Sequence, residues 1–182
     1  QLGDVNFDGI INIVDLVTIV NMILGSTQIH NSADYNQDGV INIVDVVQIV
    51  SLILGNTDID ASIASLVKDG ENLNLTADGY IGAIQLSLSH NLDFMINLSD
   101  DALISEYNTE GNTTKLILVE PYSDKIFSTS SDFIIDEIIV MNSNEIINVN
   151  QPYIFHLGQA YPNPFNPITN INFSIPNNDF VS

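Results

Sequence analysis

An internal duplication is the feature that most limits how this chain can fold. Residues 4–25 read DVNFDGIINIVDLVTIVNMILG and residues 34–55 read DYNQDGVINIVDVVQIVSLILG, so that 15 of 22 positions are identical at an offset of 30 residues. Self-similarity at a fixed period indicates that one supersecondary unit occurs more than once. We therefore expect the first third of the chain to fold as two copies of one small unit.

Each copy opens with the pattern D-x-N-x-D-G-x-I-N-x-x-D, which has the spacing of an EF-hand calcium loop. In such a loop, positions 1, 3, 5 and 12 supply side-chain oxygens, position 7 supplies a carbonyl, and position 9 acts directly or through water. Gly9 and Gly39 stand at position 6, where the chain turns sharply. The predicted metal ligands are Asp4, Asn6, Asp8, Ile10, Asn12 and Asp15 in the first loop and Asp34, Asn36, Asp38, Val40, Asn42 and Asp45 in the second.

The ligand types favour calcium. All of them are oxygens, which suits a hard cation, and about seven ligands suit Ca²⁺ better than octahedral Mg²⁺. Asp and Asn beside Gly also form plain solvated turns, which is the alternative interpretation of one loop. Two such loops in tandem argue against it, because three Asp within twelve residues repel one another without a cation between them. The sequence predicts two Ca²⁺ ions.

A helix is predicted after each loop, at about 13–24 and 43–54, with Gly25 and Gly55 as C-cap signals. Few residues precede either loop in this sequence, so we expect each unit to be a loop followed by a helix, half of a full EF-hand. The polar stripe of each helix is narrow, and two helices alone do not bury so wide an apolar face. The surplus apolar surface needs a partner, either another protein or a neighbouring part of this chain.

Residues 2–56 resemble a type I dockerin, through the two loop–helix repeats, the Asp at position 12 and the Ile-Asn pair at positions 8 and 9. The resemblance implies a non-catalytic module that docks onto cohesin modules, with repeats related by near two-fold symmetry that permits either of two orientations. Many dockerins carry Ser-Thr and Lys-Arg at their recognition positions, which are aliphatic or uncharged here, so the well-known cellulosomal specificity is not expected. The partner-binding residues that the resemblance implies are Ile13, Val14, Val20, Asn21, Ile43, Val44, Val50 and Ser51.

From about residue 70 the pattern becomes alternating, which predicts a small antiparallel β-sandwich at 70–150 after a linker at 59–69. Turn signals such as Asp78-Gly79 and Pro121 separate the candidate strands. The segments GAIQLSLSH and DFIIDEIIVMNS resemble a cohesin-like sandwich. The candidate strands are 73–76, 84–89, 94–98, 102–107, 113–120, 132–141 and 145–149.

Composition and motifs exclude several classes of function. The chain has 23 Asp and Glu against three Lys, and a net charge of −20 repels nucleic acid and anionic membranes. No apolar run approaches the roughly 20 residues that membrane insertion needs. Cys is absent, so disulfide and thiolate chemistry are excluded. No nucleophile, zinc or phosphate-loop motif occurs, so we expect no enzyme here; any catalytic domain would lie upstream.

The C-terminal segment 155–176 reads FHLGQAYPNPFNPITNINFSIP. Pro162, Pro164 and Pro167 also fit a plain connection that leads into a strand. The pattern is similar to the start of the C-terminal sorting domain of type IX secretion, which directs Gram-negative bacterial proteins across the outer membrane. That family domain continues for several more strands, so we expect a truncated sorting domain at 151–182. The resemblance implies a secreted or cell-surface protein.

The expected fold class is therefore α+β multidomain: a dockerin-like calcium module at 1–58, the linker at 59–69, the small sandwich at 70–150 and the truncated sorting domain. Two functions stay open. In the first, the module docks onto a cohesin-like partner on another protein. In the second, it packs on the adjacent β domain as a calcium-stabilised stalk of a secreted hydrolase or adhesin, with polysaccharide catabolism as one context. Exposure of Ile13, Val14, Ile43 and Val44 favours the first, and their burial favours the second.

Overall fold

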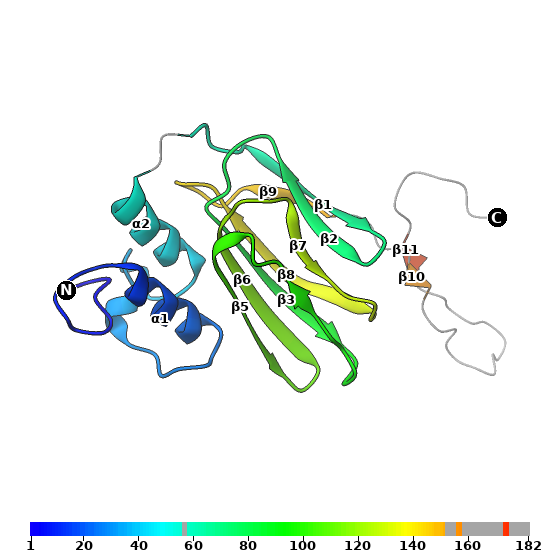
Figure 1. The fold of residues 1–182 in the computed structure, drawn as a ribbon, viewed down its shortest axis with the longest axis horizontal. Helices are drawn as coiled ribbons and strands as arrows, with labels where there is room; N and C mark the ends of the chain where they lie inside the picture. Colours follow the sequence, from blue (N-terminus) through cyan, green and yellow to red (C-terminus); the bar gives the residue numbers. More distant parts are fainter. Residues whose placement is uncertain (56–57, 152–155, 158–172, 175–182) are drawn as a thin grey trace. The chain divides into compact units, whose positions relative to one another are not determined.

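The computed structural model describes residues 1–55, 58–151, 156–157 and 173–174. The chain divides into two compact units, Gln1–Asn150 and Gln151–Ser182. The first unit stacks three layers: a pair of helices, a four-stranded sheet and a five-stranded sheet (Figure 1). In the second unit, β10 (His156–Leu157) pairs antiparallel with β11 (Phe173–Ser174). The rest of the predicted sorting domain lies outside the described residues.

The two predicted helices are confirmed as α1 (Ile13–Ile23) and α2 (Ile43–Leu54). Each begins with the same capping box, because the side chain of Asn12 or Asn42 accepts a hydrogen bond from the second helical residue. The Asp three residues later accepts one from the N–H of that same Asn. Such caps stabilise a helix by about 1 kcal/mol each. A 3₁₀ turn, η1 (Asn31–Ala33), precedes the second loop.

The middle layer is antiparallel throughout, in the order β5 (Ala102–Glu110), β6 (Thr113–Pro121), β3 (Ala83–His90), β8 (Phe133–Met141). In β6 the run Leu116-Ile117-Leu118-Val119 is completely buried. Leu116 and Leu118 belong to the core between the sheets, whereas Ile117 and Val119 belong to the core beneath the helices. A continuous apolar run is typical of a strand that is buried on both faces.

The outer layer has the order β4 (Asn97–Leu98), β7 (Lys125–Ser128), β2 (Asn72–Ala77), β1 (Ile63–Asp69), β9 (Asn148–Asn150). Its strands pair antiparallel except β1 with β9, which is parallel. Leu66, Leu73, Leu75 and Phe127 point into the core between the sheets. The opposite face meets solvent, as alternation along a half-buried strand predicts. The prediction of a small sandwich is confirmed, as a five-stranded sheet packed on a four-stranded sheet.

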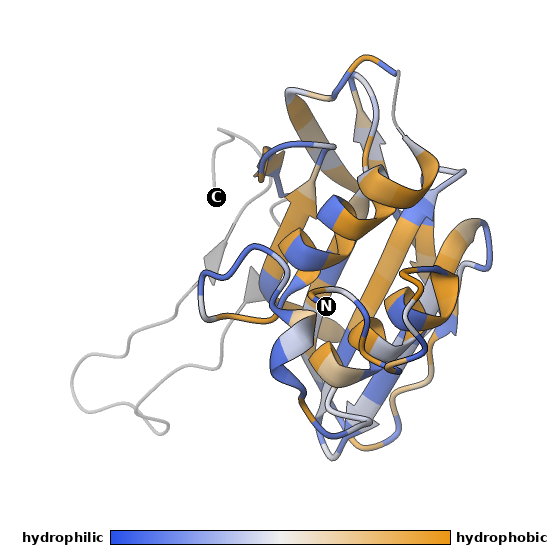
Figure 2. Ribbon diagram, turned by 90° about the vertical axis from the view of Figure 1, so that its left-hand side faces the viewer, coloured by the Kyte–Doolittle hydropathy of each residue, from blue (hydrophilic) through white to orange (hydrophobic). Residues whose placement is uncertain are grey.

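The helices pack on the four-stranded sheet through one continuous apolar core. On the helix side it includes Leu16, Ile19, Val46 and Val50, and on the sheet side Ala83, Ile104, Ile117, Val119 and Met141. Seen from the helix side, hydrophobic helix segments lie over hydrophobic strands (Figure 2). Residues 1–150 therefore form one compact unit, where the sequence predicted a separate module and sandwich.

The predicted linker at 59–69 is wrong, because Ile63–Asp69 is strand β1 and Ala61 is already buried. The small residues of IASLVKD weaken the apolar alternation that marks a strand. Strands β1 and β2 form a hairpin, in which Gly70 and Glu71 connect the paired residues Asp69 and Asn72. The dipeptide Asp69-Gly70 is a turn signal that could have indicated this hairpin. Strand β7 was also missed, and only Asn97–Leu98 of the predicted strand 94–98 is paired.

Asp78 fixes the entry into β1. Its carboxylate accepts hydrogen bonds from the hydroxyl and the N–H of Ser62 and from the N–H of Ile63. These bonds, led by the Ser62 hydroxyl, lower the pKa of Asp78 from 3.8 to about 2. A carboxyl with a lowered folded-state pKa stabilises the fold above its unfolded-state pKa and loses that contribution as pH falls through the folded value.

We predict that Asp78→Ala lowers the urea midpoint at neutral pH, and that the deficit relative to wild type shrinks as pH falls from 3.8 towards about 2. The measurement is urea unfolding of both proteins across this pH range, with the exposed Asp100→Ala as the matched control. A deficit that does not change with pH would contradict the assigned role of the ionised carboxylate.

Candidate functional site

The first loop folds around its own side chains. The Oδ2 of Asp4 accepts the N–H of Gly9 at 3.1 Å, the Oδ1 of Asn6 accepts that of Asp8 at 2.9 Å, and the Oδ1 of Asp8 accepts that of Ile10 at 2.8 Å. Gly9 has φ +86°, a left-handed backbone that favours glycine. These short-range bonds gather the oxygens of positions 1, 3 and 5 around one turn.

The second loop repeats this geometry. Gly39 donates to Asp34 at 3.0 Å, Asp38 donates to Asn36 at 2.9 Å, and Val40 donates to Asp38 at 2.8 Å. Position 4 is left-handed in both loops, at Phe7 (φ 61°) and Gln37 (φ 59°). The duplicated sequence therefore gives a duplicated local structure, with one difference: the Oδ1 of Asp34 also accepts the N–H of Asp38, whereas the Oδ1 of Asp4 has no such partner among the described residues.

The position-12 carboxylates, Asp15 and Asp45, are fully buried. In each, Oδ1 accepts two backbone N–H groups from the start of its loop, and Oδ2 accepts the N–H of the helix N-cap Asn. Desolvation nevertheless raises the pKa of Asp45, and the nearby charge of Asp34 adds to the effect against the opposing hydrogen bonds. Burial of a carboxylate disfavours its charged form unless a positive charge lies nearby.

The residues present fit a hard divalent cation. The donors of each loop are carboxylate, amide and carbonyl oxygens, the ligand types that Ca²⁺ takes. Asp4 is 5% exposed, and its Oδ1 is buried without a hydrogen-bond partner among the described residues. Within that same part of the chain, no three His, Cys, Asp or Glu side chains converge as a metal-holding group. A site here would therefore draw on Asn and carbonyl oxygens as well as carboxylates.

The predicted partner-binding residues divide into three sets: exposed, half-buried and buried. Ile13 and Val14 are 41% and 54% exposed. Asn21, Val44 and Ser51 are half-buried, and the amide of Asn21 donates to the carbonyl of Val17. The structure does not bring the remaining residues to a surface that a partner could contact, because they lie in the core beneath the helices: Val20, Ile43 and Val50.

Two residues that the sequence did not single out fix the helices on the sheet. Gly82 lies where a Cβ would come 3.1 Å and 3.3 Å from the methyl groups of Val47 and 3.0 Å from the carbonyl oxygen of Asn142. The amide of Asn108 on β5 donates to the carbonyl of Leu24 at the end of α1, at 3.1 Å. An isolated Gly before a strand indicates a close backbone approach, which was the available signal for Gly82.

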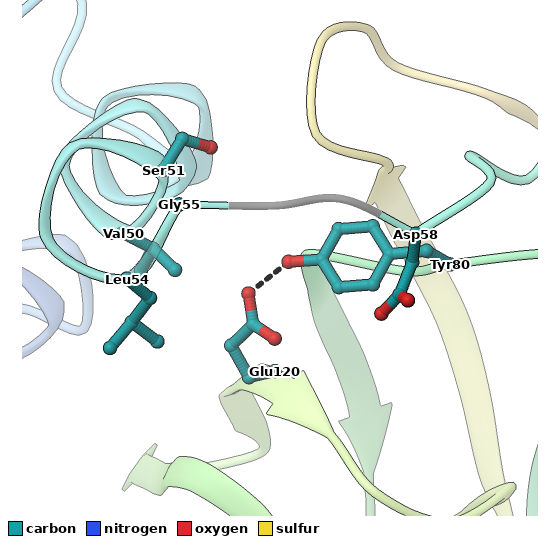
Figure 3. Close-up of a pocket in the computed structure, with 7 residues that line it drawn as sticks. All are labelled: Val50, Ser51, Leu54, Gly55, Asp58, Tyr80 and Glu120. Carbon is teal, nitrogen blue, oxygen red and sulfur yellow. Dashed lines mark hydrogen bonds between the residues drawn. The ribbon is translucent and has the colours of Figure 1, made fainter.

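A pocket of about 120 Å³ lies beside the C-terminal end of α2 (Figure 3). Tyr80 points its hydroxyl at Glu120 and donates to its Oε1. Desolvation, with a smaller contribution from the charge of Asp58, raises the pKa of Glu120 above its ordinary 4.5, although the Tyr80 hydrogen bond opposes this. Burial also raises the pKa of Tyr80. The pair joins the connection between β2 and β3 to the end of β6 by a polar contact.

We predict that Glu120→Gln raises stability at neutral pH and makes no difference near pH 4. A raised folded-state pKa means that the fold has its full stability below 4.5 and loses stability as pH rises through the folded value. Gln keeps an acceptor for Tyr80 and does not ionise. Urea midpoints of both proteins test this, with exposed Glu106→Gln as the control; a variant less stable than wild type at pH 7 would overturn it.

The fold and loops define a class of module, a duplicated loop–helix pair packed on a β-sandwich. Within it, residues 2–54 match the family model of the Dockerin type I domain, and the predicted resemblance of this segment is confirmed. Domains of this family bind calcium, dock onto cohesins, occur in extracellular proteins and are non-catalytic. Among the described residues, none of the helices has the length and apolar character that crossing a membrane requires.

One solved structure with a detectable likeness is the "Non-cellulosomal cohesin from the hyperthermophilic archaeon Archaeoglobus fulgidus". It is 18% identical, covers 52% of this chain and 84% of its own chain, and gives a TM-score of 0.32. At that TM-score the likeness carries no argument about function. None of the curated protein sequences matches the chain.

Proposed function

We propose that this chain is a non-catalytic, calcium-dependent docking unit, in which two loops each bind one Ca²⁺ ion and the helices that follow dock on a β-sheet. The match of residues 2–54 to the Dockerin type I domain supports calcium binding. The donor types of both loops support two sites. The buried Oδ1 of Asp4, which has no hydrogen-bond partner among the described residues, supports the site in the first loop.

The ions would be held by the residues that the EF-hand spacing assigns. These are the side chains of positions 1, 3, 5 and 12, the carbonyls of Ile10 and Val40, and Asn12 and Asn42 directly or through water. Bound Ca²⁺ would supply positive charge to loops that each carry three Asp, with no Lys or Arg in residues 1–67. Because the position-12 Asp is also the third residue of the capping box, the loop and the helix start would be stabilised together.

The sheet on which the helices dock is the chain's own. The observation that carries this is the single apolar core shared by α1, α2 and the strands β3, β5, β6 and β8. The 0% exposure of Ile43 and Val47 supports it, since these residues lie on the part of α2 that packs on the sheet. The sandwich would thus occupy the position of a cohesin-like partner within the same chain.

The wider setting rests on sequence patterns alone. The segment 155–176 supports export by type IX secretion and a place outside a Gram-negative cell. The Dockerin match supports an extracellular location in general. A docking unit next to a sorting signal would connect an upstream hydrolase or adhesin to the cell exterior.

We predict that the full chain takes up two Ca²⁺ ions, that Asp4→Ala or Asp34→Ala alone leaves one, and that the double variant takes up none. Calcium at 100 times its Kd would stabilise each site by about 2.7 kcal/mol. Isothermal titration calorimetry and thermal unfolding measure both effects. Exposed Asp100→Ala is the control and should retain both ions; a wild-type chain that binds none would refute the proposal.

Docking on the chain's own sheet is testable because the chain has no Cys, so one introduced thiol is the only one. In Ca²⁺, we predict that a thiol reagent modifies the Ile13→Cys chain at least about tenfold faster than the Ile43→Cys chain, since Ile13 is 41% exposed and Ile43 is 0% exposed. Without Ca²⁺ the two rates should converge. Equal rates in Ca²⁺, with two ions bound, would refute docking while leaving calcium binding intact.

A further inference from the structure

The first loop contains one ligand oxygen that the fold leaves unsatisfied. Asp4 is 5% exposed, and its Oδ1 is buried without a hydrogen-bond partner among the described residues. Its other oxygen, Oδ2, accepts the N–H of Gly9. A buried carboxylate oxygen without a partner costs free energy, which a cation bound at that oxygen recovers. The first loop therefore gains from a cation beyond what its ligand types alone provide.

The equivalent oxygen of the second loop already has a partner. Asp34 is half-buried, its Oδ1 accepts the N–H of Asp38 at 3.1 Å, and its Oδ2 accepts that of Gly39 at 3.0 Å. A cation at this carboxylate relieves no unsatisfied oxygen, so it gains less. Both loops have the same ligand types at the EF-hand positions, so ligand charge does not compensate for this difference.

The first loop is also held at two points against residues 30–35, which lead into the second loop. The N–H of Gly3, directly before the first loop, donates to the carbonyl of Ser32 at 2.7 Å. Gly3 is so close to Tyr35 that a Cβ would come 3.3 Å from its ring. The ring of Phe7, at position 4, meets the ring of His30 edge-on, with 4.7 Å between the centroids. Rigidity of an EF-hand loop raises its affinity, because less ordering is needed on binding.

The corresponding positions of the second repeat make different contacts. Position 4 is Gln37, which has no ring, and the residue 30 positions after His30 is Asp60. Ala33, the equivalent of Gly3, donates its N–H to the carbonyl of His30, inside the 3₁₀ turn before its own loop. Two nearly identical loops thus differ in how firmly the fold holds their ligands.

Resting on the proposed function, we propose that the two calcium sites are unequal: the first loop is the tighter site and fills first, and the second loop is the weaker site. Between the two dissociation constants, only the occupancy of the second loop changes with Ca²⁺ concentration. That loop leads into α2, whose first residue, Ile43, lies in the core beneath the helices. The calcium-responsive site is therefore the one next to the helix start that packs on the chain's own sheet.

Two single variants isolate the sites. Asp34→Ala leaves the first site and Asp4→Ala leaves the second, and calorimetry of each full chain with Ca²⁺ gives the affinity of the site that remains. We expect the remaining site of the Asp34→Ala chain to bind at least about tenfold tighter than that of the Asp4→Ala chain. Equal affinities, or the reverse order, would overturn the proposal.

A pair of reporters keeps every ligand side chain in place, since substitution of the buried Asp4 can disturb the fold. The chain has no Trp, so Ile10→Trp and Val40→Trp each place one indole in one loop. Both positions have exposed side chains, and only their carbonyls are assigned as ligands. The emission of the Ile10→Trp chain should change at about tenfold lower free Ca²⁺ than that of the Val40→Trp chain. Coincident midpoints would refute unequal sites.

Exchanges at position 4 test the cause of the difference. Phe7→Gln gives the first loop the residue of the second and removes the contact with His30, so calorimetry should show a weaker first site. Gln37→Phe should leave the second site unchanged, because Asp60 and not a ring stands at the equivalent of His30. Equal effects of the two exchanges would contradict the role of the ring contact.

Failure of this inference can be distinguished from failure of the proposed function. A wild-type chain that takes up two Ca²⁺ ions with equal affinity overturns unequal sites and leaves calcium binding intact. A chain that takes up no Ca²⁺ refutes the proposed function first.

Discussion

The part of the four-stranded sheet that the helices cover is buried on both faces, and the positions of the helices and of the outer sheet depend on that burial. In β6, Leu116 and Leu118 enter the core between the sheets, while Ile117 and Val119 enter the core beneath the helices. Removing the helices would expose the sheet residues of their shared core, which are Ala83, Ile104, Ile117, Val119 and Met141, and removing the sheet would expose the helix residues packed on them. This shared apolar burial explains why residues 1–150 form one unit.

Polar contacts at the edges fix how the layers meet. Gly82 has no side chain, so Val47 can pack against it. Its N–H donates a hydrogen bond to the carbonyl of Met141, and its carbonyl accepts one from the N–H of Glu120. Asn108 satisfies the carbonyl of Leu24, which is one of the unpaired groups that every helix end leaves. Apolar burial alone permits sliding between a helix pair and a sheet. These contacts fix one position of the helix pair on the sheet. In that position the two nearly identical repeats differ in which of their residues are buried.

The sequence predicted what depends on local pattern. The loops, the caps at Asn12 and Asn42, and both helix spans follow from residues close together in the chain. The sequence left open what depends on distant contacts, namely which face of the helices is covered. Ile13 and Ile43 stand in identical local sequences, so no local rule separates them. Strand β1 was missed for a related reason: Ala64 and Leu66 become core residues only through strands far along the chain.

Calcium and docking are linked through the geometry of the second repeat. Asp45 is both the last ligand position of its loop and the third residue of α2, two residues beyond the fully buried Ile43. On the proposed function, an ion in that loop stabilises the helix end that the chain's own sheet covers. The equivalent Asp15 lies two residues beyond exposed Ile13, so an ion in the first loop stabilises the end that remains free. Two sites of nearly identical sequence would then have different consequences, because the sandwich covers only one of the helix ends that they organise.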